Sequence, residues 1–328
     1  MKHRYYLFFS LLITVGLLFS CKPSKPKTLP KPSIDLEEAL ERRDVDAVKY
    51  WAHEQRYNTT LRFPHSVTPL MLAAKTGNEE ILQATLNTDW NVNSTDNAGY
   101  TPLHWAVMYK KPKAVEMLIA AGAKVDPDEA WQTPLNLAIK NRDLEMVKLL
   151  IGLGADVNKE REEYRDTPLM WAATWGQADI IRVLLENGAK TGVKNEDGDT
   201  ALTLASREFC PDCVKMLIEA GEDVNNGYEK GKIPVLVAGE TCNDDSVKVL
   251  IEAGADKTVK DEDNATPFIL SAKNGCLYND DILFYAESGI DMKAKDAYGK
   301  SALDYLEDDP RTTDKTIELL KQELAKLK

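Results

Sequence analysis

The sequence predicts an all-α solenoid, a fold in which short helix-turn-helix units stack side by side along one axis. One tripeptide motif returns eight times, beginning at Thr68, Thr101, Thr133, Thr167, Thr200, Ile233, Thr266 and Ser301 and reading Thr-Pro-Leu in its first four copies. The steps between copies are 33, 32, 34, 33, 33, 33 and 35 residues. A near-constant period of this length is typical of stacked repeat proteins, which present a long surface for binding and need no catalytic cleft.

The unit that begins at Thr101 shows why each repeat should be a helix pair. Its threonine can accept a free backbone N–H at a helix start, and Pro102 suits the first helical position because it has no N–H to leave unsatisfied. A second apolar run at 114–119 repeats its side chains at helical spacing. Gly122 then suits the left-handed residue that ends a helix. Polar, turn-rich segments such as 96–99 are expected to join one pair to the next in β-hairpin-like loops.

This pattern resembles the ankyrin repeat. Thr101-Pro102-Leu103-His104 matches the opening segment of that family, and Gly154-Ala155-Asp156-Val157-Asn158 matches its closing segment. The resemblance covers residues 34–328 and departs from the family where Ile233 replaces the threonine. It implies an ankyrin-repeat solenoid with an N-terminal cap at 34–66, repeats at about 67–300 and a C-terminal cap at 301–328.

The first 33 residues have the composition of an export signal and a tether. Residues 1–20 combine a basic start with an apolar stretch and end on a small residue, which predicts a secretory signal peptide. Leu18-Phe19-Ser20-Cys21 resembles the bacterial lipobox, so Cys21 is the predicted lipidation site; an ordinary cleaved signal with an incidental cysteine is the alternative. Residues 21–33 are rich in proline and lysine, as in an extended linker. We therefore expect a lipoprotein of the bacterial cell envelope, at the outer membrane facing the periplasm.

The charge of the chain limits the class of partner. The full chain carries −12, and residues 34–328 carry −18 once the signal and the lysine-rich tether are excluded. Nucleic acid requires a basic surface, so this charge argues against it, and membrane contact is expected only through the lipid anchor. The simplest expectation is a basic or neutral protein partner bound by a monomer, with no cofactor.

Four cysteines remain beyond Cys21. Because adjacent repeats in an ankyrin stack lie about 10 Å apart, Cys276 should not reach Cys210 or Cys213 two repeats away. The complete pairing that this geometry allows is Cys210–Cys213 with Cys242–Cys276, and a single Cys210–Cys242 bridge with two free thiols is the alternative. The Cys-Pro-Asp-Cys segment that begins at Cys210 also admits a thiol redox role, although it lies outside the βαβ context that favours one.

No arrangement of residues predicts catalysis or a metal site. The resemblance implies that His104 makes structural hydrogen bonds, and His53 and His65 lack the spacing of metal ligands. No serine lies in a Gly-x-Ser-x-Gly elbow, and no glycine-rich phosphate loop is present. The protein is therefore expected not to be an enzyme.

In the ankyrin family, partner contacts usually come from hairpin tips and from the first helix of each repeat. These positions predict a partner-binding surface made of Tyr100, Trp105, Met108, Tyr109, Trp131, Tyr164, Trp171 and Trp175. Residues four apart share a helix face, which pairs Trp105 with Tyr109 and Trp171 with Trp175. The two tryptophans at 105 and 171 fit equally well as packing between helix layers.

These features together favour an envelope-anchored protein-protein interaction module. One alternative is an inhibitor or immunity-type protein that caps a toxin or an enzyme. The other is the thiol redox role at Cys210 and Cys213.

Overall fold

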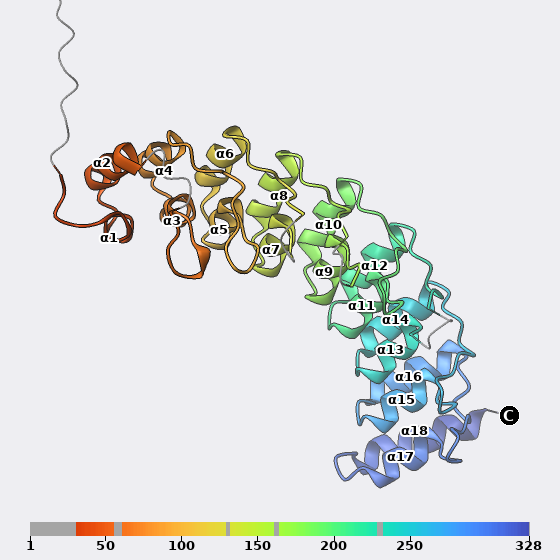
Figure 1. Cartoon of the computed structure of the whole chain (residues 1–328). Coiled ribbons are helices and arrows are strands. Elements are labelled where there is room, and N and C mark those ends of the chain that lie inside the picture. Colours follow the sequence, from red (N-terminus) through yellow and green to blue (C-terminus); the bar gives the residue numbers. More distant parts are fainter. Residues whose placement is uncertain (1–30, 56–60, 129–131, 161–163, 228–231, 328) are drawn as a thin grey trace, which may run out of the picture.

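The computed structural model describes residues 31–55, 61–128, 132–160, 164–227 and 232–327. Within these residues the chain forms eighteen α-helices and no strand, so the predicted all-α repeat fold is confirmed. Two rows of helices run along an arch (Figure 1).

The inner row faces the concave side of the arch and contains the first helix of each pair. Its members are α1 (Leu36–Arg42), α3 (Pro69–Thr76), α5 (Pro102–Met108), α7 (Pro134–Lys140), α9 (Pro168–Thr174), α11 (Ala201–Arg207), α13 (Pro234–Glu240), α15 (Pro267–Lys273) and α17 (Ala302–Asp308). A short 3-10 turn, Pro64–Ser66, precedes α3.

The outer row contains the second helix of each pair and faces the convex side. Its members are α2 (Val45–Gln55), α4 (Glu79–Leu86), α6 (Pro112–Ala120), α8 (Leu144–Gly152), α10 (Ala178–Glu186), α12 (Pro211–Glu219), α14 (Asp244–Glu252), α16 (Asn279–Ser288) and α18 (Asp314–Lys326). No helix in the described part of the chain is both long and apolar enough to cross a bilayer.

The recurring tripeptide begins the inner helices. Its first side chain accepts the backbone N–H three residues later at Thr68, Thr133, Thr167, Thr200, Thr266 and Ser301. Such a cap satisfies one of the free donors at a helix start and contributes about 1 kcal/mol. The side chain of Ile233 cannot accept a hydrogen bond, so α13 begins without a side-chain cap.

The third residue of the tripeptide builds a continuous core. It is buried in the first seven copies, at Leu70, Leu103, Leu135, Leu169, Leu202, Val235 and Phe268. Leu303, in the eighth copy, is only half-buried. In the described residues α17 packs on α15 on one side and on α18. Each repeat is thus stabilised mainly by its neighbours, as expected for a solenoid.

His104 has the structural role that the family resemblance implies. Its Nδ1 accepts the backbone N–H of Thr101 at 3.1 Å, and its Nε2 lies 2.9 Å from the carbonyl oxygen of Gln132 in the next repeat, to which it donates. Burial lowers the pKa of His104 to about 4, so the ring is neutral at pH 7. Asn136 holds the same position one repeat later, and neither of its buried polar atoms has a hydrogen-bond partner among the described residues.

Candidate partner-binding surface

Among the aromatic residues predicted to bind a partner, Tyr109 and Trp175 are the most solvent-exposed ones on the inner row. Each directly follows an inner helix, Tyr109 after α5 and Trp175 after α9. Their exposed fractions are 39% and 43%. Two repeats separate them, which corresponds to about 20 Å along the stack. They therefore offer two separate aromatic contacts on one edge of the concave side.

Trp105 and Trp171 are half-buried and pack partly against the core. The indole N–H of Trp105 donates to Asp96 in the preceding loop at 2.9 Å. Tyr305 and Asp296 repeat this contact at the same spacing in the eighth repeat, with the two oxygens 2.6 Å apart. This aromatic residue thus fastens the loop to the inner helix, and the recurring aspartate nine residues earlier is the sequence signal for it.

The other predicted residues do not join one cluster. Tyr164 is 44% exposed in the loop before α9, at the opposite end of that helix from Trp175. Tyr100 is half-buried and stacks on His104 with ring centroids 5.1 Å apart. Met108 is half-buried at the end of α5. Trp131 and Cys21 lie outside the described residues.

Tyr109 has a basic neighbourhood that sequence reasoning missed. Its ring lies 5.9 Å from that of Trp105, and the Nζ of Lys75 lies 5.2 Å from its centroid. The ring borders a cavity of about 330 Å³ that Arg43 and Lys111 also line. Lys75 shares its repeat position with Met108 and could have been found by aligning the repeats. Arg43 precedes the first repeat, so no repeat position marks it.

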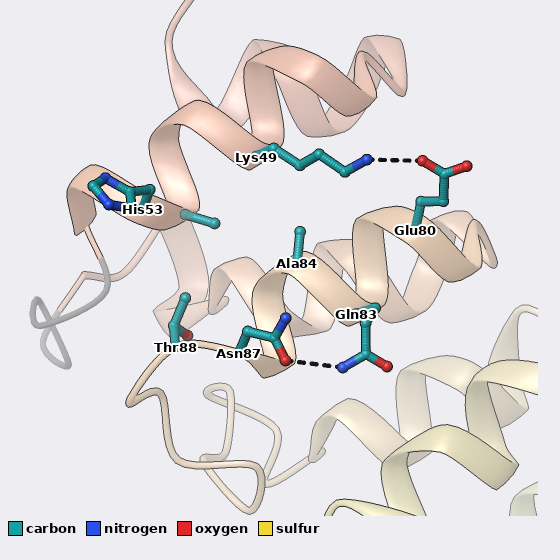
Figure 2. A pocket seen from close by; sticks show the side chains of 8 residues that line it. Lys49, His53, Glu80, Gln83, Ala84, Asn87 and Thr88 are labelled. Atoms are coloured by element: carbon teal, nitrogen blue, oxygen red, sulfur yellow. Dashed lines mark hydrogen bonds and ion pairs between the residues drawn. The ribbon is translucent and has the colours of Figure 1, made fainter. Parts of the chain in front are cut away.

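A larger groove lies between the outer helices α2 and α4 (Figure 2). Its volume is about 600 Å³. Lys49 and Glu80 close one side with a 2.9 Å ion pair, and Gln83 donates to Asn87 at 2.9 Å. The polar groups that Figure 2 joins are already paired with one another, so we do not regard this groove as a candidate site.

The C-terminal repeats contain an acidic pocket of about 470 Å³ between the loops that precede α14 and α16. Asp244 is buried there, and its Oδ1 accepts the hydroxyls of Ser271 at 2.8 Å and Tyr285 at 3.1 Å. Desolvation, aided by the negative charge of nearby Asp281, raises the pKa of Asp244 to about 6. Lys248 pairs with Asp281 at 3.0 Å and so neutralises part of this charge.

The structure brings the four cysteines into the complete pairing that the ankyrin geometry allowed. Cys210 and Cys213 form one disulfide at the start of α12, with Cα atoms 5.2 Å apart. Cys242 and Cys276 form the other, which joins repeats six and seven across 5.3 Å between Cα atoms. A single Cys210–Cys242 bridge is therefore wrong. A thiol redox role for Cys210 and Cys213 stays a hypothesis, since a disulfide at this position fits a structural and a reactive role alike.

Charge is distributed unevenly along the arch. Residues 34–165 contain 21 acidic and 16 basic residues, whereas residues 166–328 contain 32 and 19. The C-terminal half thus carries most of the negative charge, and the Tyr109 region lies in the less acidic half. In the described part of the chain, no group of three or more His, Cys, Asp or Glu residues is placed to hold a metal ion.

Comparison with known proteins decides the family. The family model for "Ankyrin repeats (3 copies)" matches residues 36–129, 125–195 and 187–261, which together cover more than half of the chain. The chain belongs to the ankyrin repeat family. Its inner helices and loops are therefore the ankyrin surfaces, and the family's members generally use such repeats for protein-protein interaction.

Two curated relatives are similar to about half of this chain. It is 33% identical over 165 residues to "Putative palmitoyltransferase ZDHHC13" from Danio rerio, covering 50% of this chain and 26% of that protein. It is 32% identical over 170 residues to "Glycerophosphocholine phosphodiesterase gde1" from Schizosaccharomyces pombe, covering 51% of this chain and 12% of that protein. The chain thus spans about a quarter or less of these relatives.

A solved structure shares the ankyrin fold over a longer stretch. The crystal structure of the ankyrin repeat domain of Bcl-3, described as a unique member of the IkappaB protein family, has a TM-score of 0.54 and 25% identity to this chain. The match covers 68% of this ankyrin chain and 99% of that one.

Proposed function

We propose that this ankyrin repeat protein is a bacterial envelope lipoprotein that binds a protein partner through the concave side of its arch. The observation on which the binding site rests is the exposure of Tyr109 and Trp175 at the ends of two inner helices. Large aromatic side chains that stay open to solvent on a concave surface are typical binding hot spots, because each buries much apolar area at little entropic cost. Rigid neighbouring repeats hold both rings in place before binding.

Anchoring is proposed from the sequence of the first 33 residues. A lipid on Cys21, followed by the proline-rich segment up to Ser33, would hold the ankyrin repeats away from the membrane surface and leave the concave side open. A partner in the same envelope compartment would then meet the concave side without competition from the bilayer.

Partner binding is tested by capture from envelope extract of the source organism. We expect the full chain to retain a protein that a Tyr109→Ala/Trp175→Ala variant retains at least tenfold less, because each truncated hot spot costs about 2 kcal/mol or more. Quantitative mass spectrometry of the retained proteins measures this ratio.

The matched control is Tyr298→Ala, which removes an equally large exposed ring from the loop before α17. This control should retain the partner as the wild type does. Equal retention by the double variant and the wild type would refute the concave aromatic site, and the absence of any specifically retained protein would refute the interaction module.

Anchoring is tested with Cys21→Ser. The wild-type chain should incorporate labelled palmitate in the source organism and sediment with the membrane fraction, whereas the variant should incorporate none and stay in the supernatant. Label-free wild-type protein in the supernatant would contradict the lipoprotein assignment and leave the binding proposal untouched.

A further inference from the structure

The cavity beside Tyr109 has the chemistry of an anion site, although it lies in an acidic chain. It opens where the N-terminal cap meets the first two repeats, and it is lined by residues of α1 and α3 and of the turns that follow α1 and α5. Leu40 and Leu72 form its apolar part, and Arg43, Lys75 and Lys111 contribute three cations. We call it the Tyr109 pocket.

The three cations of this pocket have no anionic partner. In the described part of the chain, neither Arg43, Lys75 nor Lys111 forms an ion pair, and Lys75 instead lies over the ring of Tyr109. Glu41 lines the same cavity but lies beyond ion-pair distance from all of them. A cavity lined by three cations attracts an anionic group of a partner.

The backbone holds two of the three cationic residues, Arg43 and Lys111, in position. The stem of Lys111 packs on Gly77, where a Cβ would come within 2.5 Å of the Lys111 Cδ. Gly77 also has a φ of +68°, a conformation that other residues adopt at a cost. Arg43 ends α1 with a φ of 56°, and its backbone N–H caps the carbonyls of that helix. The side chains of Arg43 and Lys111 therefore start from fixed points on the rim.

A structural explanation accounts for part of this arrangement. Arg43 and Lys75 lie at the ends of the inner helices α1 and α3, where positive charge stabilises the helix by a few tenths to about 1 kcal/mol, but Lys111 is the N-cap residue of α6, where positive charge does not. That effect would act equally well with the side chains directed apart. It does not account for three unpaired cations, an apolar floor and an open tyrosine ring around the same cavity.

We infer that the Tyr109 pocket binds a carboxylate of the partner protein, on an acidic side chain or at the chain end. The inference rests on the proposed partner binding and adds the orientation in which the partner lies along the arch. An acidic group of the partner lies against Arg43, Lys75 and Lys111, and basic groups of the partner lie toward the acidic repeats at 166–328. A partner with separated charges fits this arch better than the uniformly basic or neutral one expected from net charge alone.

The test needs no knowledge of the partner. Rhodamine-labelled hexaglutamate is titrated with the full chain at low salt, and binding is followed by fluorescence anisotropy. Hexaglutamate should bind, hexaglutamine should not, and added salt should weaken the binding because exposed charges are screened. Lys75→Glu and Arg43→Glu should each weaken binding by about tenfold, since each reversal replaces an attraction with a repulsion.

The matched control is Lys190→Glu, which changes the net charge equally at an exposed lysine between α10 and α11. It should alter hexaglutamate binding by less than about threefold. Circular dichroism melting of each variant shows whether the fold is kept. Equal weakening by Lys190→Glu would refute a specific pocket, as would an absence of hexaglutamate binding.

A second experiment distinguishes a carboxylate ligand from a phosphate ligand. Inorganic phosphate that protects the Arg43 and Lys75 region from hydrogen exchange, with no binding of hexaglutamate, would overturn the carboxylate assignment. Because these assays contain no envelope extract, their failure is independent of the capture experiment with Tyr109→Ala/Trp175→Ala.

Discussion

Replacing Cys242 and Cys276 together with alanine is expected to lower the free energy of unfolding by about 4 kcal/mol. Their disulfide closes a loop with a sequence separation of 34. A cross-link of this length removes much of the conformational freedom of the unfolded chain, and the stabilisation grows with loop length to about 4 kcal/mol here. The bond also joins the loops that begin two neighbouring outer helices, α14 and α16, so its loss weakens the contact between repeats six and seven.

Urea unfolding followed by circular dichroism measures this loss. Because repeat proteins are stabilised mainly between neighbours, the variant should also show earlier exchange of amide hydrogens in α15 to α18 than in α5 to α10. Treatment of the Cys210→Ala/Cys213→Ala variant with a strong reductant, which leaves only the Cys242–Cys276 disulfide to break, should reproduce both effects.

The matched control is Cys210→Ala/Cys213→Ala. This disulfide spans a sequence separation of 3 within one repeat, so its removal should cost about 2 kcal/mol or less. If the two double variants lost the same stability, or if the local pair lost more, loop closure would not be the source of the effect.

The sequence predicted the architecture of this protein well because its repeats are encoded locally. A threonine that caps a helix, a proline suited to the first helical position and a leucine directed into the core recur at one spacing. Each of these residues determines the structure of only the few residues around it. The same regularity left one complete disulfide pairing, because it places Cys276 out of reach of Cys210 and Cys213, but the structure was needed to exclude the single Cys210–Cys242 bridge.

The candidate site was less predictable because its contacts cross between repeats. Trp105 and Tyr109 share a helix face, but an aspartate nine residues upstream holds Trp105 inward. The Tyr109 pocket combines Arg43 of the cap with Lys75 and Lys111 of two different repeats. Only the stacking of three units brings those cations together, and the cap carries no repeat motif from which Arg43 could be placed.

Replacing Asp244 with asparagine is expected to stabilise the protein at neutral and alkaline pH. Burial raises the pKa of this carboxyl from 3.8 to about 6, and a pKa difference of that size corresponds to about 3 kcal/mol. The native state thus holds the proton more tightly than the unfolded chain does. The stability that protonated Asp244 provides is therefore complete below 3.8 and is lost as the pH rises through about 6.

Asparagine mimics the protonated form at every pH. Its side-chain oxygen can still accept the hydroxyls of Ser271 and Tyr285, which bond to the Oδ1 of Asp244 in the wild type. We therefore expect Asp244→Asn to raise the free energy of unfolding by about 2–3 kcal/mol at pH 8 and by almost nothing at pH 4. Urea unfolding of both proteins at pH 4, 6 and 8 measures the difference, in which the opposing titration of buried His104 cancels.

Asp245→Asn is the control, because Asp245 follows Asp244 in the first turn of α14 but is exposed. Both carboxylates experience the same favourable helix start, so the comparison isolates burial. Asp245→Asn should change stability by less than about 1 kcal/mol, without the steep pH dependence. If Asp244→Asn instead destabilised the protein equally at pH 4 and pH 8, the buried carboxylate would be ionised and held by its hydroxyl donors, and its negative charge would strengthen the fold.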